Sequence, residues 1–290
     1  MSPATHWRGT LVGAVAIGMW ASLALFTALS GAVPPFQVVA MAFGVAALLA
    51  VGKWVYRREN PARHLRQPAG AWMLGVGGLF GYHFLFFFSL RHAPAVEANL
   101  INYLWPLLIV LFSALLPGER LRWWHVVGAL MGLGGTILLV AAGAPPNLAD
   151  GSALGYTTAL GAALAWSSYS VLNRRFGTVP TDAVGGFVGV AALLALASHL
   201  IFETTAWPET PLQWFAVLML GLGPAGGAFF FWDYGVKHGD IQLLGTWAYA
   251  APLLSTLLLI GFGLGTFTWA VVIACLLIVG GGAMAARPRS

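Results

Sequence analysis

Apolar runs about as long as a bilayer is thick dominate the chain, and only short polar breaks separate them. A spanning helix needs about 20 predominantly apolar residues. Inside lipid, only helices and closed barrels satisfy every backbone hydrogen bond. Charged residues make up 8% of the sequence, whereas soluble domains carry about a quarter. We therefore predict an all-α integral membrane protein and exclude a water-soluble domain.

Breaks at charges and at Pro or Gly clusters predict ten transmembrane helices with short connections, of which the longest is the basic segment Arg57 to Pro68. The first apolar stretch lacks a cleavage signature, so we interpret it as a span and not as a signal peptide. The predicted spans are Thr10–Leu29, Pro35–Tyr56, Ala69–Leu90, Ala95–Leu116, Trp123–Ala142, Ser152–Arg174, Asp182–Phe202, Leu212–Tyr234, Ile241–Leu259 and Thr266–Ala286.

The positive charges predict the orientation of these spans. If the loops alternate between the two sides, one side holds thirteen of the fourteen Lys and Arg residues and the other holds Arg91 alone. By the positive-inside rule, both termini are then cytoplasmic in a multi-pass protein of the cell (inner) membrane. The basic excess is explained in this way, and we expect no nucleic-acid partner. The thirteen are Arg8, Lys53, Arg57, Arg58, Arg63, Arg66, Arg120, Arg122, Arg174, Arg175, Lys237, Arg287 and Arg289.

The sequence also repeats itself after 146 positions. The shift aligns Trp, Pro and Tyr residues, which match by chance far less often than Ala and Leu do. It predicts a duplicated five-helix unit, with a first repeat over residues 1–145 and a second over 146–290. Because five is odd, the second repeat is inverted, and such proteins bind solutes near the midplane between the repeats. The aligned pairs include Trp20/Trp166, Pro34/Pro180, Arg91/Lys237, Tyr103/Tyr249, Pro106/Pro252 and Trp123/Trp269.

Several motifs resemble one known family over nearly the whole chain. Each half has a Trp in its first helix (GMWAS and LAWSS) and a Pro midway along its fourth (NYLWP and AYAAP). The first half continues with a Glu-Arg turn and a Gly-rich fifth helix (GERLRWWHVVGALMGLGG). This combination is similar to the EamA-type drug/metabolite transporter superfamily, and ANLINYLWPLL is most similar to its aromatic amino acid exporters. The second half departs from the pattern, because Gly265 stands where Glu119 would repeat.

The fourth predicted helix has one polar face. Asn99, Asn102 and Tyr103 are spaced so that they share this face, and Trp105 follows them. A polar face on a membrane helix must point at protein or water. We predict that these residues bind a zwitterionic solute, and contact between helices is the alternative. In the ninth helix the matching face is smaller but keeps Tyr249, which we also assign to the site.

Two prolines interrupt the fourth and ninth helices. Pro106 and Pro252 each free a carbonyl one turn earlier and permit a kink. We predict that both act as gating elements, although membrane helices also tolerate Pro without such a role.

The first and sixth helices carry further candidates. Trp166, Tyr169 and Ser170 share a face of the sixth helix, and Trp20 is the counterpart of Trp166 in the first. Both tryptophans lie in mid-span and not in the interfacial belt that Trp prefers. We assign all four residues to the substrate site, with simple packing of large rings as the alternative.

The third and eighth helices contribute the remaining candidates. Tyr82, His83 and Trp232 are assigned to the cavity. A mid-membrane His is costly without a partner, so His83 is a candidate ligand or proton carrier, but we favour a His that is simply hydrogen-bonded. Asp233 lies within an apolar run, and Lys237 four residues later predicts a surface ion pair in preference to proton coupling.

No enzyme motif is present. The chain lacks a Walker loop, HExxH and GxSxG, and its single cysteine, Cys275, rules out a disulfide or a Cys metal site within one chain. We expect no cofactor and no metal. A nearly uncharged path suits neutral or zwitterionic solutes with apolar or aromatic parts. The resemblance implies broad export of neutral and aromatic amino acids by a monomer in the lipid bilayer. Export of drugs or other small metabolites is the alternative, and a channel or membrane enzyme is less favoured.

Overall fold

The computed structural model describes residues 3–143, 152–263 and 266–287, and within these ranges the chain forms helices and no strand. Seven described segments are long and apolar enough to cross a bilayer, and two shorter apolar helices accompany them. The predicted all-α membrane fold is confirmed. The seven segments are Thr5–Leu29, Pro35–Tyr56, Ala69–His92, Ala95–Ser113, Trp123–Ala142, Thr181–Phe202 and Ile241–Gly261, and the shorter helices are Pro211–Leu222 and Trp269–Ala285.

Each of the ten predicted spans corresponds to one helix or to consecutive helices. The short helix α4 (Pro61–Leu65) lies in the basic segment, outside these spans. In chain order the spans are α1 (Pro3–Ala21) with α2 (Leu23–Leu29); α3 (Pro35–Tyr56); α5 (Ala69–Val76), the π-helix η1 (Gly77–Gly81) and α6 (Tyr82–His92); α7 (Ala95–Asn102) with α8 (Trp105–Ser113); α9 (Trp123–Gly143); α10 (Ala153–Leu172) with η3 (Asn173–Phe176); η4 (Thr181–Ala183) with α11 (Val184–Phe202); α12 (Pro211–Leu222) with α13 (Ala228–His238); α14 (Ile241–Trp247) with α15 (Ala250–Gly261); and α16 (Trp269–Ala285).

Five of the spans are interrupted within their length. For three of them the cause is readable in the sequence: Pro106 lacks an N–H, a glycine-rich stretch forms η1, and residues 223–227 (GPAGG) separate α12 from α13. In lipid, irregular backbone is tolerated only where it is buried in protein or lines a cavity. The interruptions therefore point to the interior of the bundle.

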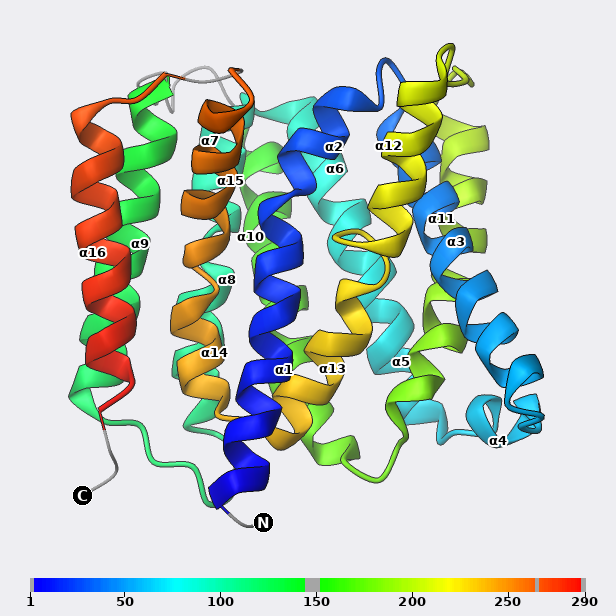
Figure 1. Ribbon diagram of the computed structural model, residues 1–290, viewed down its shortest axis with the longest axis horizontal. Helices are drawn as coiled ribbons and strands as arrows, with labels where there is room; N and C mark the ends of the chain where they lie inside the picture. The colour runs from blue at the N-terminus through cyan, green and yellow to red at the C-terminus, as the bar shows by residue number, and fades with distance from the viewer. Residues whose placement is uncertain (1–2, 144–151, 264–265, 288–290) are drawn as a thin grey trace.

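The helices of the two repeats pack in an arrangement that is nearly symmetric between the repeats. α1 begins and α16 ends at the same end of the molecule, while α2, α7 and α15 lie at the opposite end (Figure 1). α1 packs along α13 as its counterpart α10 packs along α6, and α3 and α9 each pack on their own counterparts, α11 and α16. These pairings are those of two inverted units related by a pseudo-two-fold axis.

The symmetry is broken between the fourth and ninth spans. α8 packs closely on α14, but the equivalent pair, α15 and α7, has no such contact. The end that carries the termini is therefore closed between these spans, and the opposite end is not. Two polar links between the repeats reinforce the closed end: Glu119 lies 2.9 Å from Arg174, and the Asp240 N–H donates to Thr10 Oγ1 at 2.8 Å.

The described basic residues follow the predicted sorting. They flank the start of α1, the ends of α3, α10 and α13, and the short helix α4, all at the end where the termini lie (Figure 1). Arg91 stands at the opposite end, where it donates to the Phe202 carbonyl at 3.1 Å and lies 3.8 Å from the Glu203 carboxylate. Gly265 and Arg289 are outside the described residues.

Candidate functional site

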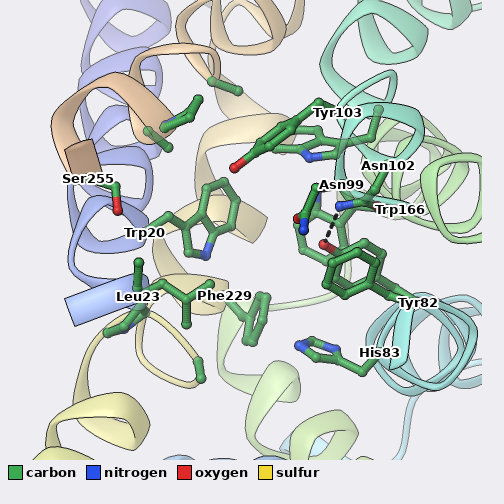
Figure 2. Close-up of a pocket in the computed structure, with 18 residues that line it drawn as sticks. Trp20, Leu23, Tyr82, His83, Asn99, Asn102, Tyr103, Trp166, Phe229 and Ser255 are labelled. Atoms are coloured by element: carbon green, nitrogen blue, oxygen red, sulfur yellow. Dashed lines mark hydrogen bonds between the residues drawn. The ribbon is translucent and has the colours of Figure 1, made fainter. Parts of the chain in front are cut away.

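A cavity of about 190 Å³ lies where the interrupted spans meet (Figure 2). Of its described lining residues, Trp166 alone comes from an uninterrupted helix, α10. Eight of the twelve predicted binding residues lie in the lining. The lining is Trp20, Leu23, Ala24, Tyr82, His83, Phe86, Asn99, Asn102, Tyr103, Trp105, Trp166, Pro224, Ala225, Phe229, Ala248, Ala251, Pro252 and Ser255.

The cavity extends towards the end opposite the termini. Leu23, Asn99 and Ser255 come from α2, α7 and α15, the helices that lie at that end (Figure 1). Towards the termini, tryptophan rings close it. The ring of Trp20 lies 5.9 Å from that of Trp105, 5.8 Å from that of Trp166 and 5.0 Å from that of Trp232. These edge-on and tilted contacts build a wide aromatic wall that suits a flat apolar group.

The polar groups of the cavity lie mainly on α6 and α7. Asn102 donates to the Tyr82 hydroxyl at 3.2 Å (Figure 2). His83 bonds through Nδ1 to the backbone carbonyl one turn earlier at 2.7 Å, which leaves Nε2 as its second polar atom, and Asn99 donates to the carbonyl one turn before it at 2.7 Å. The Asn102 Oδ1 atom is buried without a partner among the described residues. Because amide orientation is assigned and not observed, one end of this amide is unpartnered in either orientation.

The cavity carries no fixed charge. Within the described lining there is no Lys, Arg, Asp or Glu. An ion pair with a charged solute is therefore unavailable in this cavity, and recognition rests on amides, hydroxyls, one imidazole and aromatic faces.

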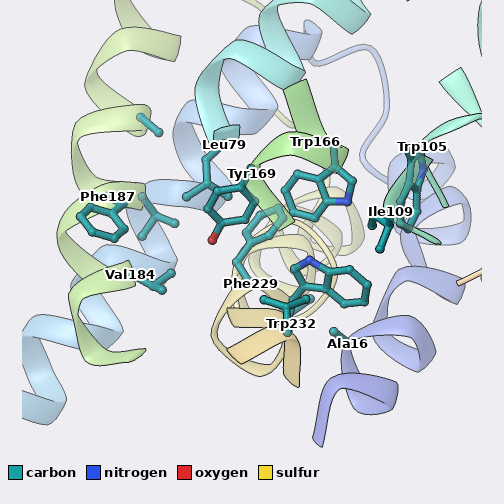
Figure 3. Close-up of a cluster of buried hydrophobic side chains, with 14 of the residues drawn as sticks. Ala16, Leu79, Trp105, Ile109, Trp166, Tyr169, Val184, Phe187, Phe229 and Trp232 are labelled. Atoms are coloured by element: carbon teal, nitrogen blue, oxygen red, sulfur yellow. The ribbon is translucent and has the colours of Figure 1, made fainter. Parts of the chain in front are cut away.

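Three predicted binding residues lie behind the lining. Tyr169 is buried on the side of Phe187, away from Trp105 (Figure 3), and its ring fills the space above Gly78, where a Cβ would meet it at 2.5 Å. Ser170 accepts a hydrogen bond from Trp232 Nε1 at 3.0 Å, which ties α10 to α13. Tyr169, Ser170 and Trp232 therefore support the cavity wall from behind and do not line the cavity themselves.

Tyr249 lies outside the lining as well. It is fully buried, and its hydroxyl lies between the Leu107 N–H at 3.1 Å and the Tyr103 carbonyl at 3.2 Å. Of the two predicted gating prolines, Pro252 lines the cavity, while Pro106 is buried immediately after the break between α7 and α8. Their gating roles remain predictions.

The prediction that Asp233 and Lys237 form an ion pair at the surface is wrong, because the pair is buried. Asp233 and Lys237 do pair at 2.8 Å, but each side chain is only 1% exposed. Asp233 also accepts from Asn173 at 2.7 Å and from Thr181 at 2.6 Å. The spacing of four residues predicts the pairing but not the burial, because η3 and η4 cover this face of α13.

One group of potential metal ligands lies away from the cavity. The donor atoms of Glu59, His64 and Asp182 all lie within 4.8 Å of one another. Their carboxylates already have partners: Asp182 is paired with Lys53, and Glu59 bonds to His64 at 2.8 Å. Neutralised carboxylates of this kind are weak ligands for a cation.

Comparison with known proteins decides the family. The profile of the EamA-like transporter family matches residues 7–141 and again residues 153–287. The chain belongs to the EamA-like transporter family. The two matches fall one on each five-span repeat.

Curated relatives of this EamA-like chain are named as exporters or transporters. The aromatic amino acid exporter YddG of Ancylobacter novellus is 50% identical over 277 residues, which cover 95% of this chain and 96% of that protein. The YddG protein of Escherichia coli is 26% identical and covers 88% of each chain. The biotin transporter of Salmonella typhimurium is 27% identical over 78% of this chain and 76% of its own. A solved crystal structure at 49% identity superposes with a TM-score of 0.91 over 96% of this chain and 97% of that one.

Sequence reasoning missed part of the lining of this EamA-like transporter. Phe229 and the turn residues Pro224 and Ala225 face the cavity, as do the small residues Ala251 and Ser255 of α15. The signal for the turn was present, because GPAGG in the middle of a predicted span breaks a membrane helix, and broken spans mark transporter sites. The small residues carry no comparable signal, since Ala is common on every face of such helices.

Proposed function

We propose that this chain exports aromatic and other neutral amino acids from the cytoplasm by alternating access between its two repeats. The observation that carries the proposal is the unequal packing of equivalent helices around an uncharged aromatic cavity: α8 packs closely on α14, whereas α15 and α7 do not pack closely on each other. The similarity to proteins named aromatic amino acid exporters supports the choice of cargo.

The size of the cavity favours an amino acid over a larger solute. Pockets for drug-sized ligands commonly measure about 300–1,000 Å³, whereas this one measures about 190 Å³. In the pose that we propose, the side chain lies against Trp20, Trp166 and Phe229. The ammonium group faces the unpartnered amide of Asn102, and the carboxylate accepts from the Tyr103 hydroxyl, which points into the cavity (Figure 2).

In the proposed cycle the two ends exchange their packing. Opening the end with the termini would separate α8 from α14 and break the links of Glu119 to Arg174 and of Asp240 to Thr10. Closing the other end would bring α7 and α15 together, as the repeat relation predicts. With both termini in the cytoplasm, which the positive-inside rule favours, the structure would represent the state that releases cargo outside.

Counterflow in liposomes tests the proposal. The purified chain is expected to exchange labelled phenylalanine and threonine with saturation, and a drug-like cation serves as the comparison. The measurement is repeated with and without a pH gradient to identify proton coupling. If neither amino acid moves while the cation does, the cargo assignment is wrong; flux that does not saturate would indicate a channel.

A further inference from the structure

Tyr249 occupies a gap in the backbone hydrogen bonding of the fourth span. In a continuous α-helix the Leu107 N–H would bond to the Tyr103 carbonyl four residues earlier. Here α7 ends at Asn102 and α8 begins at Trp105, and the Tyr249 hydroxyl fills the gap. It accepts from the Leu107 N–H at 3.1 Å and donates to the Tyr103 carbonyl at 3.2 Å. One hydroxyl thus satisfies both backbone groups while holding them apart.

The ring of Tyr249 has a fitted seat. Gly132 on α9 lies against it so closely that a Cβ there would be 2.5 Å from ring atom Cδ2. Val110, Leu133 and Leu253 belong to the same buried cluster. The seat fixes the ring and therefore the position of its hydroxyl in the break.

The break determines which side chains face the cavity. Asn99 and Asn102 lie on α7, before the break, and Trp105 begins α8, after it. All three line the cavity together with Tyr103. A direct bond from Leu107 to Tyr103 would close the turn that follows Pro106 and rotate α7 relative to α8, even though Pro106 itself donates no bond.

We propose that Tyr249 is a positioning residue, whose hydroxyl holds the break between α7 and α8 open and so directs the polar face of α7 into the cavity. The proposal rests on the proposed function only because one of its two tests measures transport. Tyr249 touches no solute in this arrangement, which explains a tyrosine buried outside the lining.

A tyrosine hydroxyl that bridges a break between two half-helices occurs in one repeat only. Tyr103 is the counterpart of Tyr249 but lines the cavity, and its hydroxyl makes no hydrogen bond to a described residue. The shift of 146 places Ile278 where the first repeat has Gly132. The Ile278 side chain packs against Gly135 of α9, so α16 offers no glycine seat equivalent to the one that holds Tyr249. The two tyrosines that the repeat equates therefore have different tasks.

The test compares Tyr249→Phe with matched variants in amino acid counterflow. Tyr249→Phe removes only the hydroxyl and is expected to raise the KM for phenylalanine about fivefold, the factor by which the loss of one hydrogen bond to a misdirected α7 amide would weaken binding. Gly132→Ala displaces the ring and is expected to act in the same direction. The controls are Tyr234→Phe, whose hydroxyl has no hydrogen bond to the described chain, and Gly134→Ala, whose Cβ would meet nothing within 4 Å. Both controls should keep the KM of the unaltered chain.

A merely structural role would lower the yield of folded protein and leave the KM of the folded fraction unchanged. A KM for Tyr249→Phe equal to that of Tyr234→Phe overturns the proposal, whether or not Gly132→Ala folds. A second readout needs no transport: in a Cys275→Ala background, thiol labelling of Asn99→Cys should slow when Tyr249→Phe is added. Unchanged labelling refutes the positioning role, and an unaltered chain that moves no amino acid refutes the proposed function alone.

Discussion

Replacing Asp233 with Asn should destabilise the protein far more than the same change in a partly exposed ion pair. Asp233 and its partner Lys237 are each 1% exposed, and the carboxylate also accepts from Asn173 and Thr181. Asp233→Asn leaves the Lys237 ammonium buried without a counter-charge. Removing one partner of a buried pair costs about 3–5 kcal/mol.

The matched control is Asp182→Asn. Its partner Lys53 is 40% exposed and Asp182 itself 22% exposed, and pairs that water can reach are worth only about 0–1 kcal/mol. The free energy of unfolding is measured by SDS titration in mixed micelles. Adding Lys237→Met to Asp233→Asn removes the unpaired ammonium and should recover stability. Equal losses for the two Asn variants, or no recovery in the double variant, would refute the argument from burial.

Three further predictions concern the cavity, its wall and the membrane orientation. Tyr103→Ala and Trp166→Ala should each lower amino acid flux per folded protein about tenfold, since each removes roughly 1–2 kcal/mol of contact with the solute; flux per folded protein equal to that of the unaltered chain would remove them from the site. Gly78→Ala should cost about 1–3 kcal/mol of unfolding free energy, because its Cβ would meet Tyr169 at 2.5 Å, whereas Gly81→Ala has nothing within 4 Å and serves as the control. Reporters fused to either terminus should be active only in the cytoplasm, and a periplasmic signal from either one would contradict the assigned orientation.

The sequence predicts the fold because lipid leaves few alternatives. Apolar length determines the spans, and aligned Trp, Pro and Tyr reveal the duplication; the sorting of Lys and Arg predicts the orientation. One span agrees at both ends, because Pro35–Tyr56 is both a predicted span and the observed helix α3, whereas α1 begins at Pro3 and not at the predicted Thr10. The breaks at Ser22 and within residues 223–227 were not predicted, because a window of apolar residues does not distinguish a straight helix from two half-helices.

The site is predictable only in part, for a reason that the tyrosines illustrate. Helical periodicity places Tyr169 on one face with Trp166, but it does not say which neighbour covers each end of that face. Trp166 meets the cavity, and Tyr169 meets Gly78 on η1. The repeat likewise equates Tyr103 with Tyr249, but a molecule closed at one end gives equivalent residues unlike surroundings.

Positions that the repeat equates carry different side chains at the two ends of the molecule. The shift of 146 pairs the buried Asp233 with Phe87 and pairs Asp182 with Phe36. At the end with the termini, carboxylates bind Lys and Asn side chains; towards the other end, the Phe36 and Phe87 rings lie 5.4 Å apart. Polar contacts exchange readily with water when they separate, whereas separated rings expose apolar surface that water does not satisfy. The opposite end is nevertheless held by polar contacts of its own, because the Glu203 carboxylate accepts from the Phe36 N–H at 3.0 Å and lies 3.8 Å from Arg91. The repeats are therefore equal in topology, but different residues hold each end together.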